Sequence, residues 1–216
     1  MNQLYRKTLI AGACVAVLYV LLFRLADRPA ADWCRTHCLE TRAETIGRFF
    51  SALATGSCVR LALAGGFIAV LLANPLKDCG WTRAILFICV SAAIALCVGD
   101  GLKYLLGRHR PIDWFTHGQY GLAFFQTEWH LNSSPSGHTL RAFAVCTALA
   151  LLFRRAAWGF WLLAACIGAS RVVVTAHYPS DVLFGATIGI LAALWTAVFL
   201  PPRRREPEAP APIPPT

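Results

Sequence analysis

Three short polar stretches stand beside long apolar runs, and together they hold side chains suited to phosphate chemistry. The stretches read "KYLLGRHRP" from 103, "SSPSGHTL" from 133 and "SRVVVTAHYPSD" from 170. Cations and backbone N–H donors suit a phosphate dianion whose charge shifts among its oxygens during transfer. Two histidines can take the remaining tasks, which are attack on phosphorus and protonation of the leaving oxygen. The candidate site residues are Lys103, Arg110, Ser136, Gly137, His138, Arg171, His177 and Asp181.

The stretch around His138 is predicted to open a helix. Ser133 or Ser134 can cap this helix, and its first turn accepts Pro135. The backbone N–H groups of residues 136–138 would then point outward unpaired, with the positive end of the helix dipole behind them. The glycine among them lets an anion approach closely. We therefore expect an anion-binding helix start with a histidine in its first turn.

A second histidine is predicted to lie at the edge of an apolar span. Pro179 disfavours helix at Tyr178, so one span should end near His177. The next span should begin at Ser180 or Asp181. A carboxylate that holds one imidazole nitrogen fixes the tautomer and leaves the other nitrogen basic. This pair suits a histidine that acts as a nucleophile or general base.

Cations flank these histidines. Lys103 stands near the end of an apolar run, where a lysine either snorkels to the interface or serves a site. Asp100 is three residues earlier on the same helix face and is expected to pair with it. Arg110 precedes Pro111, where the helix must stop. The pattern lacks a carboxylate cluster that would hold magnesium, so we expect neither a metal nor another cofactor.

The composition is that of a membrane protein. The chain has 216 residues, of which 57% are hydrophobic and 14% charged, and its mean hydropathy is +0.55. A transmembrane helix needs about 20 mainly apolar residues. Six runs approach that length: 8–25, 57–76, 84–106, 138–153, 157–177 and 180–200. We therefore predict an all-α bundle of six transmembrane helices.

The basic residues predict how this bundle is oriented. If both termini are cytoplasmic, every short connecting segment on that side is basic, as the positive-inside rule prefers. The loop 107–137 and the turn 178–180 then emerge together on the other side, where polar residues far apart in sequence can meet. The basic residues assigned to the cytoplasmic side are Arg6, Lys7, Lys77, Arg83, Arg154, Arg155, Arg203, Arg204 and Arg205.

Two segments lie outside the six runs. Residues 27–56 mix charged and large apolar residues, which indicates an amphipathic segment at the membrane surface or, equally, one packed on the bundle. Within it, Cys34 and Cys38 could form a disulfide or, with His37, bind a metal, but a second ligand pair is missing. Residues 201–216 are rich in proline and are predicted to be a disordered cytoplasmic tail, which leaves 1–200 as the membrane-embedded domain.

The formal net charge of +9 does not indicate nucleic acid. A nucleic-acid-binding surface would need a basic face interleaved with aromatic residues, and none appears outside the apolar runs. The partners that we expect are the lipid bilayer and a membrane lipid substrate.

The three stretches resemble the motifs of a known family. Residues 103–111 fit K-x6-RP, residues 135–138 read PSGH, and residues 170–181 fit SR-x5-H-x3-D, in that order. This is similar to the type 2 phosphatidic acid phosphatase superfamily of integral membrane lipid phosphatases, which also includes soluble haloperoxidases and acid phosphatases. The resemblance covers residues 8–200.

The resemblance implies a role for each motif position. His177 would be the nucleophile that forms a phosphohistidine, and Asp181 would orient it. His138 would protonate the leaving group and later activate water. Ser170 would give a supporting hydrogen bond. The phosphoryl oxygens would be bound by Lys103, Arg110, Ser136, Gly137 and Arg171.

The resulting hypothesis is a metal-independent phosphatase that acts on a lipid phosphate or diphosphate at the outer leaflet of a bacterial inner membrane. Family substrates are phosphatidylglycerophosphate, undecaprenyl diphosphate, phosphatidate and the lipid A phosphates. One alternative is a lipid phosphotransferase that uses the same intermediate. Another is a non-catalytic membrane protein that binds lipid headgroups through the same cations. Six apolar spans disfavour haloperoxidase chemistry.

Overall fold

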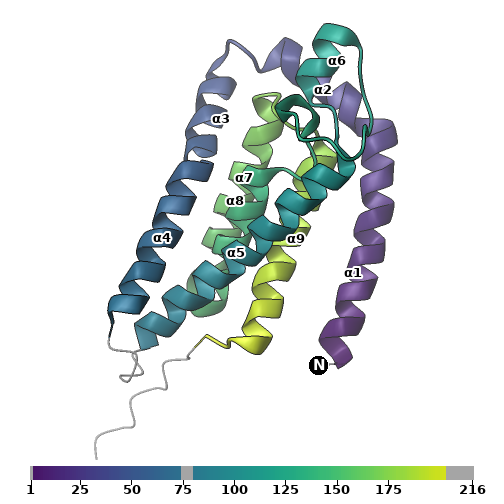
Figure 1. Ribbon diagram of the computed structural model, residues 1–216. Coiled ribbons are helices and arrows are strands. Elements are labelled where there is room, and N and C mark those ends of the chain that lie inside the picture. Colours follow the sequence, from purple (N-terminus) through teal and green to yellow (C-terminus); the bar gives the residue numbers. More distant parts are fainter. Residues whose placement is uncertain (1, 74–79, 203–216) are drawn as a thin grey trace, which may run out of the picture.

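The computed structural model describes residues 2–73 and 80–202, and within them helices form the regular structure apart from an isolated bridge between Arg108 and Leu122 (Figure 1). This confirms the all-α prediction. Two 3-10 turns, Trp129–Leu131 and Arg154–Ala156, supplement the longer elements. In chain order the longer elements are α1 (Asn2–Leu21), the π-helical turn η1 (Leu22–Ala26), α2 (Asp27–His37), α3 (Arg42–Ala52), α4 (Gly56–Leu72), α5 (Gly80–Leu106), α6 (Pro111–His117), α7 (Gly137–Leu152), α8 (Ala157–Val173) and α9 (Pro179–Phe199).

An apolar helix overlaps each of the six predicted spans, but the helices differ in length. In the described residues, four helical stretches are long and apolar enough to cross a membrane: Gln3–His37, Gly80–Leu106, Arg154–Val173 and Pro179–Phe199. Val59–Leu72 and Gly137–Leu152 are apolar but shorter. The predicted first span, 8–25, is part of a helical stretch of 35 residues because the chain stays helical through η1 into α2.

The segment between the first two apolar helices packs partly on the bundle. The side chain of Ser51 on α3 hydrogen-bonds that of Ser170 on α8, with 2.9 Å between the two Oγ atoms. Asp27 at the start of α2 is fully buried. Trp33 and Phe49 remain exposed, so the segment also carries large apolar side chains that do not pack on the bundle. Cys34 and Cys38 are buried free thiols.

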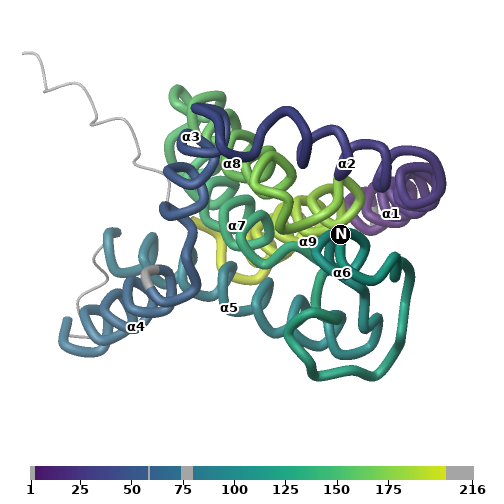
Figure 2. The backbone as a smooth tube through the Cα atoms, turned by 90° about the horizontal axis from the view of Figure 1, so that it is seen from above, coloured from purple at the N-terminus to yellow at the C-terminus, as the bar shows by residue number. Residues whose placement is uncertain are grey.

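The centre of the bundle depends on a close approach of α7 and α9, which Figure 2 shows beside each other between α5 and α8. Gly185 and Gly189 have the G-x-x-x-G spacing that lets helix backbones come close. A Cβ atom added to Gly189 would lie 2.5 Å from the carbonyl oxygen of Leu140. A Cβ atom on Gly185 would lie 2.7 Å from the carbonyl oxygen of Ser136. The glycines therefore fix where the start of α7 sits against α9.

The end of the bundle that carries α6 is formed by connections far apart in sequence. The end of α5, the start of α7 and the turn between α8 and α9 meet there, whereas the start of α1 and the end of α9 lie at the opposite end (Figure 1). Hydrogen bonds connect the helices at that opposite end: Trp195 donates to Thr8, and Arg83 donates to the carbonyl of Pro201.

Several residues that were assigned to the cytoplasmic side lie outside the described residues, as does most of the predicted tail. These are Lys77, Arg203, Arg204 and Arg205.

We predict that Gly189→Ala destabilises the protein, because the added methyl group has no room against α7. Overpacking of this kind costs about 1 to 3 kcal/mol. Thermal unfolding of the purified protein in detergent measures the loss. Gly159→Ala on α8 is the matched control, since nothing lies within 4 Å of a Cβ atom there. Equal unfolding temperatures for the two variants would contradict the close approach.

Candidate active site

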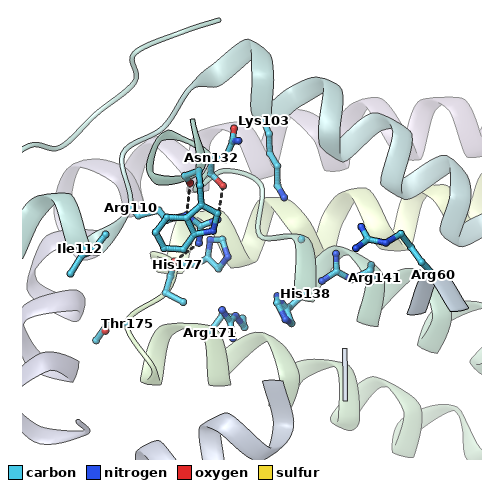
Figure 3. A pocket seen from close by; sticks show the side chains of 13 residues that line it. Arg60, Lys103, Arg110, Ile112, Asn132, His138, Arg141, Arg171, Thr175 and His177 are labelled. Carbon is cyan, nitrogen blue, oxygen red and sulfur yellow. Dashed lines mark hydrogen bonds between the residues drawn. The ribbon is translucent and has the colours of Figure 1, made fainter. Parts of the chain in front are cut away.

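A cavity of about 500 Å³ opens where the three polar stretches meet (Figure 3). Ser136 and Asp181 are fully buried and do not line it. The cavity brings together six of the predicted site residues, which are Lys103, Arg110, Gly137, His138, Arg171 and His177.

A tight turn after α8 places His177 beside Arg171. The backbone N–H groups of Ala176 and His177 both donate to the carbonyl of Arg171, at 3.0 and 3.2 Å. Thr175 adopts φ +51°, a left-handed conformation that is rare for a β-branched residue and makes this reversal possible. The sequence predicted that His177 lies at a helix end. It did not predict the left-handed conformation of Thr175, which directs the chain so that His177 lines the cavity.

The tautomer of His177 is set by a backbone carbonyl. The ring Nδ1 lies 2.8 Å from the carbonyl oxygen of Ser133 and 3.8 Å from Oδ2 of Asp181. Because a carbonyl only accepts, Nδ1 carries the hydrogen and the lone pair of the neutral ring is on Nε2. Asp181, the expected orienting partner, lies within ion-pair distance of this nitrogen but is not its nearest acceptor. Its carboxylate also accepts from the Ser133 hydroxyl at 2.6 Å.

The surroundings keep the His177 ring neutral. Burial lowers the pKa of His177 to about 4, and the cations Arg110 and Arg171 act in the same direction, while Asp181 opposes them. At neutral pH the ring is unprotonated, and the lone pair that a nucleophile needs is available.

A buried arginine that sequence reasoning missed holds Asp181. Arg108 is fully buried and binds Asp181 through Nη1 and Asp27 through Nη2. Asp27 also accepts from the backbone N–H of Ser180, at 3.0 Å. Burial alone would lower the pKa of Arg108, but the carboxylates raise it above its ordinary value. The guanidinium therefore stays charged and joins the first helical stretch to the start of α9.

Arg110 is held by backbone carbonyls. Its guanidinium donates to the carbonyls of Trp129 at 2.9 Å, Asn132 at 3.1 Å and Ala176 at 3.3 Å. The Trp129 ring lies against it, with 4.4 Å between the guanidinium carbon and the ring centroid. Since these partners are neutral, the charge of Arg110 remains available to an anion in the cavity.

Arg171 is positioned by hydroxyl groups. Its Nη1 donates to Oγ of Ser51 at 2.7 Å, and Ser51 in turn bonds Ser170. Ser170 thus has the supporting hydrogen bond expected of it. Ser51, on α3, could not be connected to Arg171 from sequence because the two residues are 120 positions apart.

The start of α7 differs from the prediction. The helix begins at Gly137 with Ser136 as N-cap, and Pro135 precedes it. Ser133 and Ser134 do not cap it, because their hydroxyls bond Asp181 and Tyr19.

Ser136 uses its backbone N–H within the protein and does not line the cavity. Its backbone N–H donates to the carbonyl of Asp181 at 3.0 Å, and its hydroxyl accepts from Thr139 at 3.0 Å. The N–H groups of Gly137 and His138 remain in the first helical turn, where no intrahelical acceptor exists. The predicted row of donors is thus reduced to these two.

Lys103 reaches across to the start of α7. A Cβ atom on Gly137 would lie 3.0 Å from its Nζ atom, so a larger residue at 137 would displace the ammonium group. The expected partner, Asp100, lies 4.0 Å away and is exposed.

The four remaining histidines have local partners outside the cavity. His109 bonds Asp113, His130 approaches Glu128, His117 bonds Thr116, and His37 stacks on Trp33. In residues 2–73 and 80–202, no three His, Cys, Asp or Glu side chains gather in a group that could hold a metal ion.

Positive charge in the cavity comes from side chains. Besides the predicted cations, Arg60 and Arg141 line the cavity.

We predict that Asp27→Asn lowers kcat about 10- to 100-fold while KM changes little, because Arg108 and Asp181 would shift and misplace His177. Steady-state turnover of purified protein checks this, with unfolding temperature recorded in parallel. Asp32→Asn is the control, since its carboxylate accepts from Trp114 at the exposed surface. An unchanged kcat in the folded fraction of Asp27→Asn would show that the bridge only stabilises the fold.

The fold and the cavity are those of an integral membrane protein with a cationic site that contains two histidines. The family model of the PAP2 superfamily matches residues 84–205, which is more than half of the chain. The chain belongs to the PAP2 superfamily.

One relative is named lipid A 1-phosphatase, from Rhizobium johnstonii. It is 37% identical over 118 residues, which cover 55% of this chain and 48% of the relative. The chain thus matches about half the length of this relative.

Two solved structures share the fold. The crystal structure of LpxE from Aquifex aeolicus has a TM-score of 0.51 and 19% identity, covering 85% of this chain and 94% of the other. A transmembrane PAP2-type phosphatidylglycerolphosphate phosphatase from Bacillus subtilis has a TM-score of 0.51 and 16% identity, covering 87% and 94%.

Proposed function

We propose that this protein is a membrane phosphatase that hydrolyses a lipid phosphate or diphosphate through a phosphohistidine on His177. The observation that carries the proposal is that His177 and His138 line one cavity with the cations Lys103, Arg110 and Arg171 (Figure 3). Membership of the PAP2 superfamily and the likeness to a lipid A 1-phosphatase support it.

The first step is attack on phosphorus. Nε2 of His177 forms a bond to phosphorus as the bond from phosphorus to the leaving oxygen breaks. His138, which takes up a proton when the phosphate anion binds beside it, gives that proton to the leaving oxygen. Neutral His177 can act without prior loss of a proton, because Nδ1 already donates to Ser133 and Nε2 carries the lone pair. Asp181 acts on His177 through Ser133 and thus fixes its position.

The second step releases phosphate. His138 accepts a proton from a water molecule, the water oxygen attacks phosphorus, and the bond from phosphorus to His177 breaks. In both steps negative charge on the phosphoryl oxygens meets Lys103, Arg110 and Arg171, together with the N–H groups of Gly137 and His138. Fixed donors aimed at developing charge are the main source of rate enhancement in such sites. Side chains supply this charge, so we include metal independence in the proposal.

We also propose that the cavity opens on the extracytoplasmic side of a bacterial inner membrane. Its lining residues Lys103 and Gly137 stand at the end of α5 and the start of α7. These helix ends lie away from the start of α1 and the end of α9 (Figure 1). The basic residues Arg6, Lys7 and Arg83 belong to helix segments at that opposite end. The positive-inside rule then favours a cytoplasmic location for that end.

Phosphate release from a panel of purified lipid phosphates in detergent tests the function. The panel is phosphatidate, phosphatidylglycerophosphate, undecaprenyl diphosphate and lipid A. We expect the wild type to release phosphate from at least one lipid, equally with and without EDTA. Replacing His177 by alanine should lower kcat by at least about 10³-fold, because the nucleophile is lost.

Three results would count against the proposal. Full activity of His177→Ala would exclude this nucleophile, and inhibition by EDTA would exclude metal independence. A wild type that binds these lipids without turnover would favour headgroup binding alone.

A further inference from the structure

The cavity contains more positive charge than one phosphate group needs. Beyond Lys103, Arg110 and Arg171, two further arginines line it, Arg60 from α4 and Arg141 from α7. In the described part of the chain neither forms a salt bridge with a carboxylate. Two guanidinium groups that share a cavity repel one another, and an anion between them would relieve the repulsion.

Arg141 is held rigidly with one edge toward the cavity. Its Nε and Nη2 atoms donate to the carbonyl of Ala54, at 3.1 and 2.9 Å, and the residue is only 8% exposed. The remaining nitrogen, Nη1, would lie 3.3 Å from a Cβ atom on Gly137. Arg141 therefore presents a donor at the same helix start that carries His138. The carbonyl of Ala54, just after α3, is a neutral acceptor. It therefore holds Arg141 in place without neutralising its charge.

The two arginines lie on one side of the cavity. Figure 3 shows His138 between His177 and Arg141, with Arg60 farther along the same direction. In phosphoryl transfer the attacking and leaving atoms are roughly in line on opposite sides of phosphorus. If His177 attacks and His138 protonates the leaving oxygen, the leaving group extends past His138 toward Arg141 and Arg60.

We infer that Arg60 and Arg141 form a second anion subsite that binds a phosphate group carried by the leaving group. This inference rests on the proposed function. The substrate class is a lipid with two neighbouring phosphates. In a lipid diphosphate the anhydride bond breaks and a lipid monophosphate leaves. In a lipid phosphomonoester whose alcohol also bears a phosphodiester, the ester bond breaks and that alcohol leaves. The leaving group of phosphatidate carries no anion for this subsite.

The test compares kcat/KM for three lipids in the same detergent: undecaprenyl diphosphate, phosphatidylglycerophosphate and phosphatidate. The first two represent the two sources of a second phosphate. We expect the wild type to prefer at least one of them to phosphatidate. Arg60→Gln and Arg141→Gln should each lower that preference about tenfold, the effect of one lost charged hydrogen bond. Arg42→Gln, an exposed arginine on α3, is the control and should leave the preference unchanged.

Several outcomes would overturn the inference. The first is a wild type whose kcat/KM for phosphatidate equals that for the other two lipids. The second is a set of variants in which kcat/KM falls equally for all three lipids, and the third is a set in which the ratios of kcat/KM are the same as in the wild type. Arg60 is exposed, so Arg60→Gln keeps the test valid if Arg141→Gln fails to fold.

Inorganic pyrophosphate separates this inference from the proposed function. If the wild type hydrolyses none of the lipids, the proposed function fails, yet the subsite can still be measured by binding. Pyrophosphate should bind the wild type more tightly than inorganic phosphate does, and Arg60→Gln should remove most of the difference. Equal binding of the two anions to the wild type would overturn the subsite.

Discussion

The active site depends on one buried guanidinium. Arg108 lies between Asp27 and Asp181 without solvent contact, so each charge needs the others. Removing one partner of such a buried pair costs about 3 to 5 kcal/mol, because an unpaired charge remains inside the protein. The bridge joins the N-terminal helical stretch, the loop before α6 and the first turn of α9. Since Asp181 also binds Ser133, whose carbonyl holds His177, the position of His177 follows from this bridge.

The other arginines near the site are held in a different way. Arg108 is neutralised by carboxylates, whereas Arg110 is anchored by backbone carbonyls, Arg171 by a serine hydroxyl and Arg141 by the carbonyl of Ala54. Neutral anchors fix geometry and leave the charge uncompensated, so the cavity keeps a field that favours polyanions. The arginines near the site thus fall into two groups. An arginine bound by carboxylates holds the helices together, whereas an arginine bound by neutral groups keeps its charge available for an anion in the cavity.

The sequence predicted the helices and most of the site because those features are local. Apolar runs mark the helices, and Pro179 marks where α9 begins. The acceptor of the Ser136 N–H was missed because it is the carbonyl of Asp181, 45 positions later in the chain. Asp27 was missed because its partner Arg108 is 81 positions away. Such pairings arise from how helices pack, and no spacing rule in one sequence contains them.

The proposed mechanism requires that His177 carries the phosphoryl group. Its most direct test is to mix purified protein with a lipid substrate labelled on the terminal phosphorus, stop the reaction within milliseconds in alkali, and map the labelled peptide. We expect an acid-labile, alkali-stable label on His177 that forms and decays fast enough to explain turnover. Turnover without labelled protein, or a label on a different residue, would contradict it.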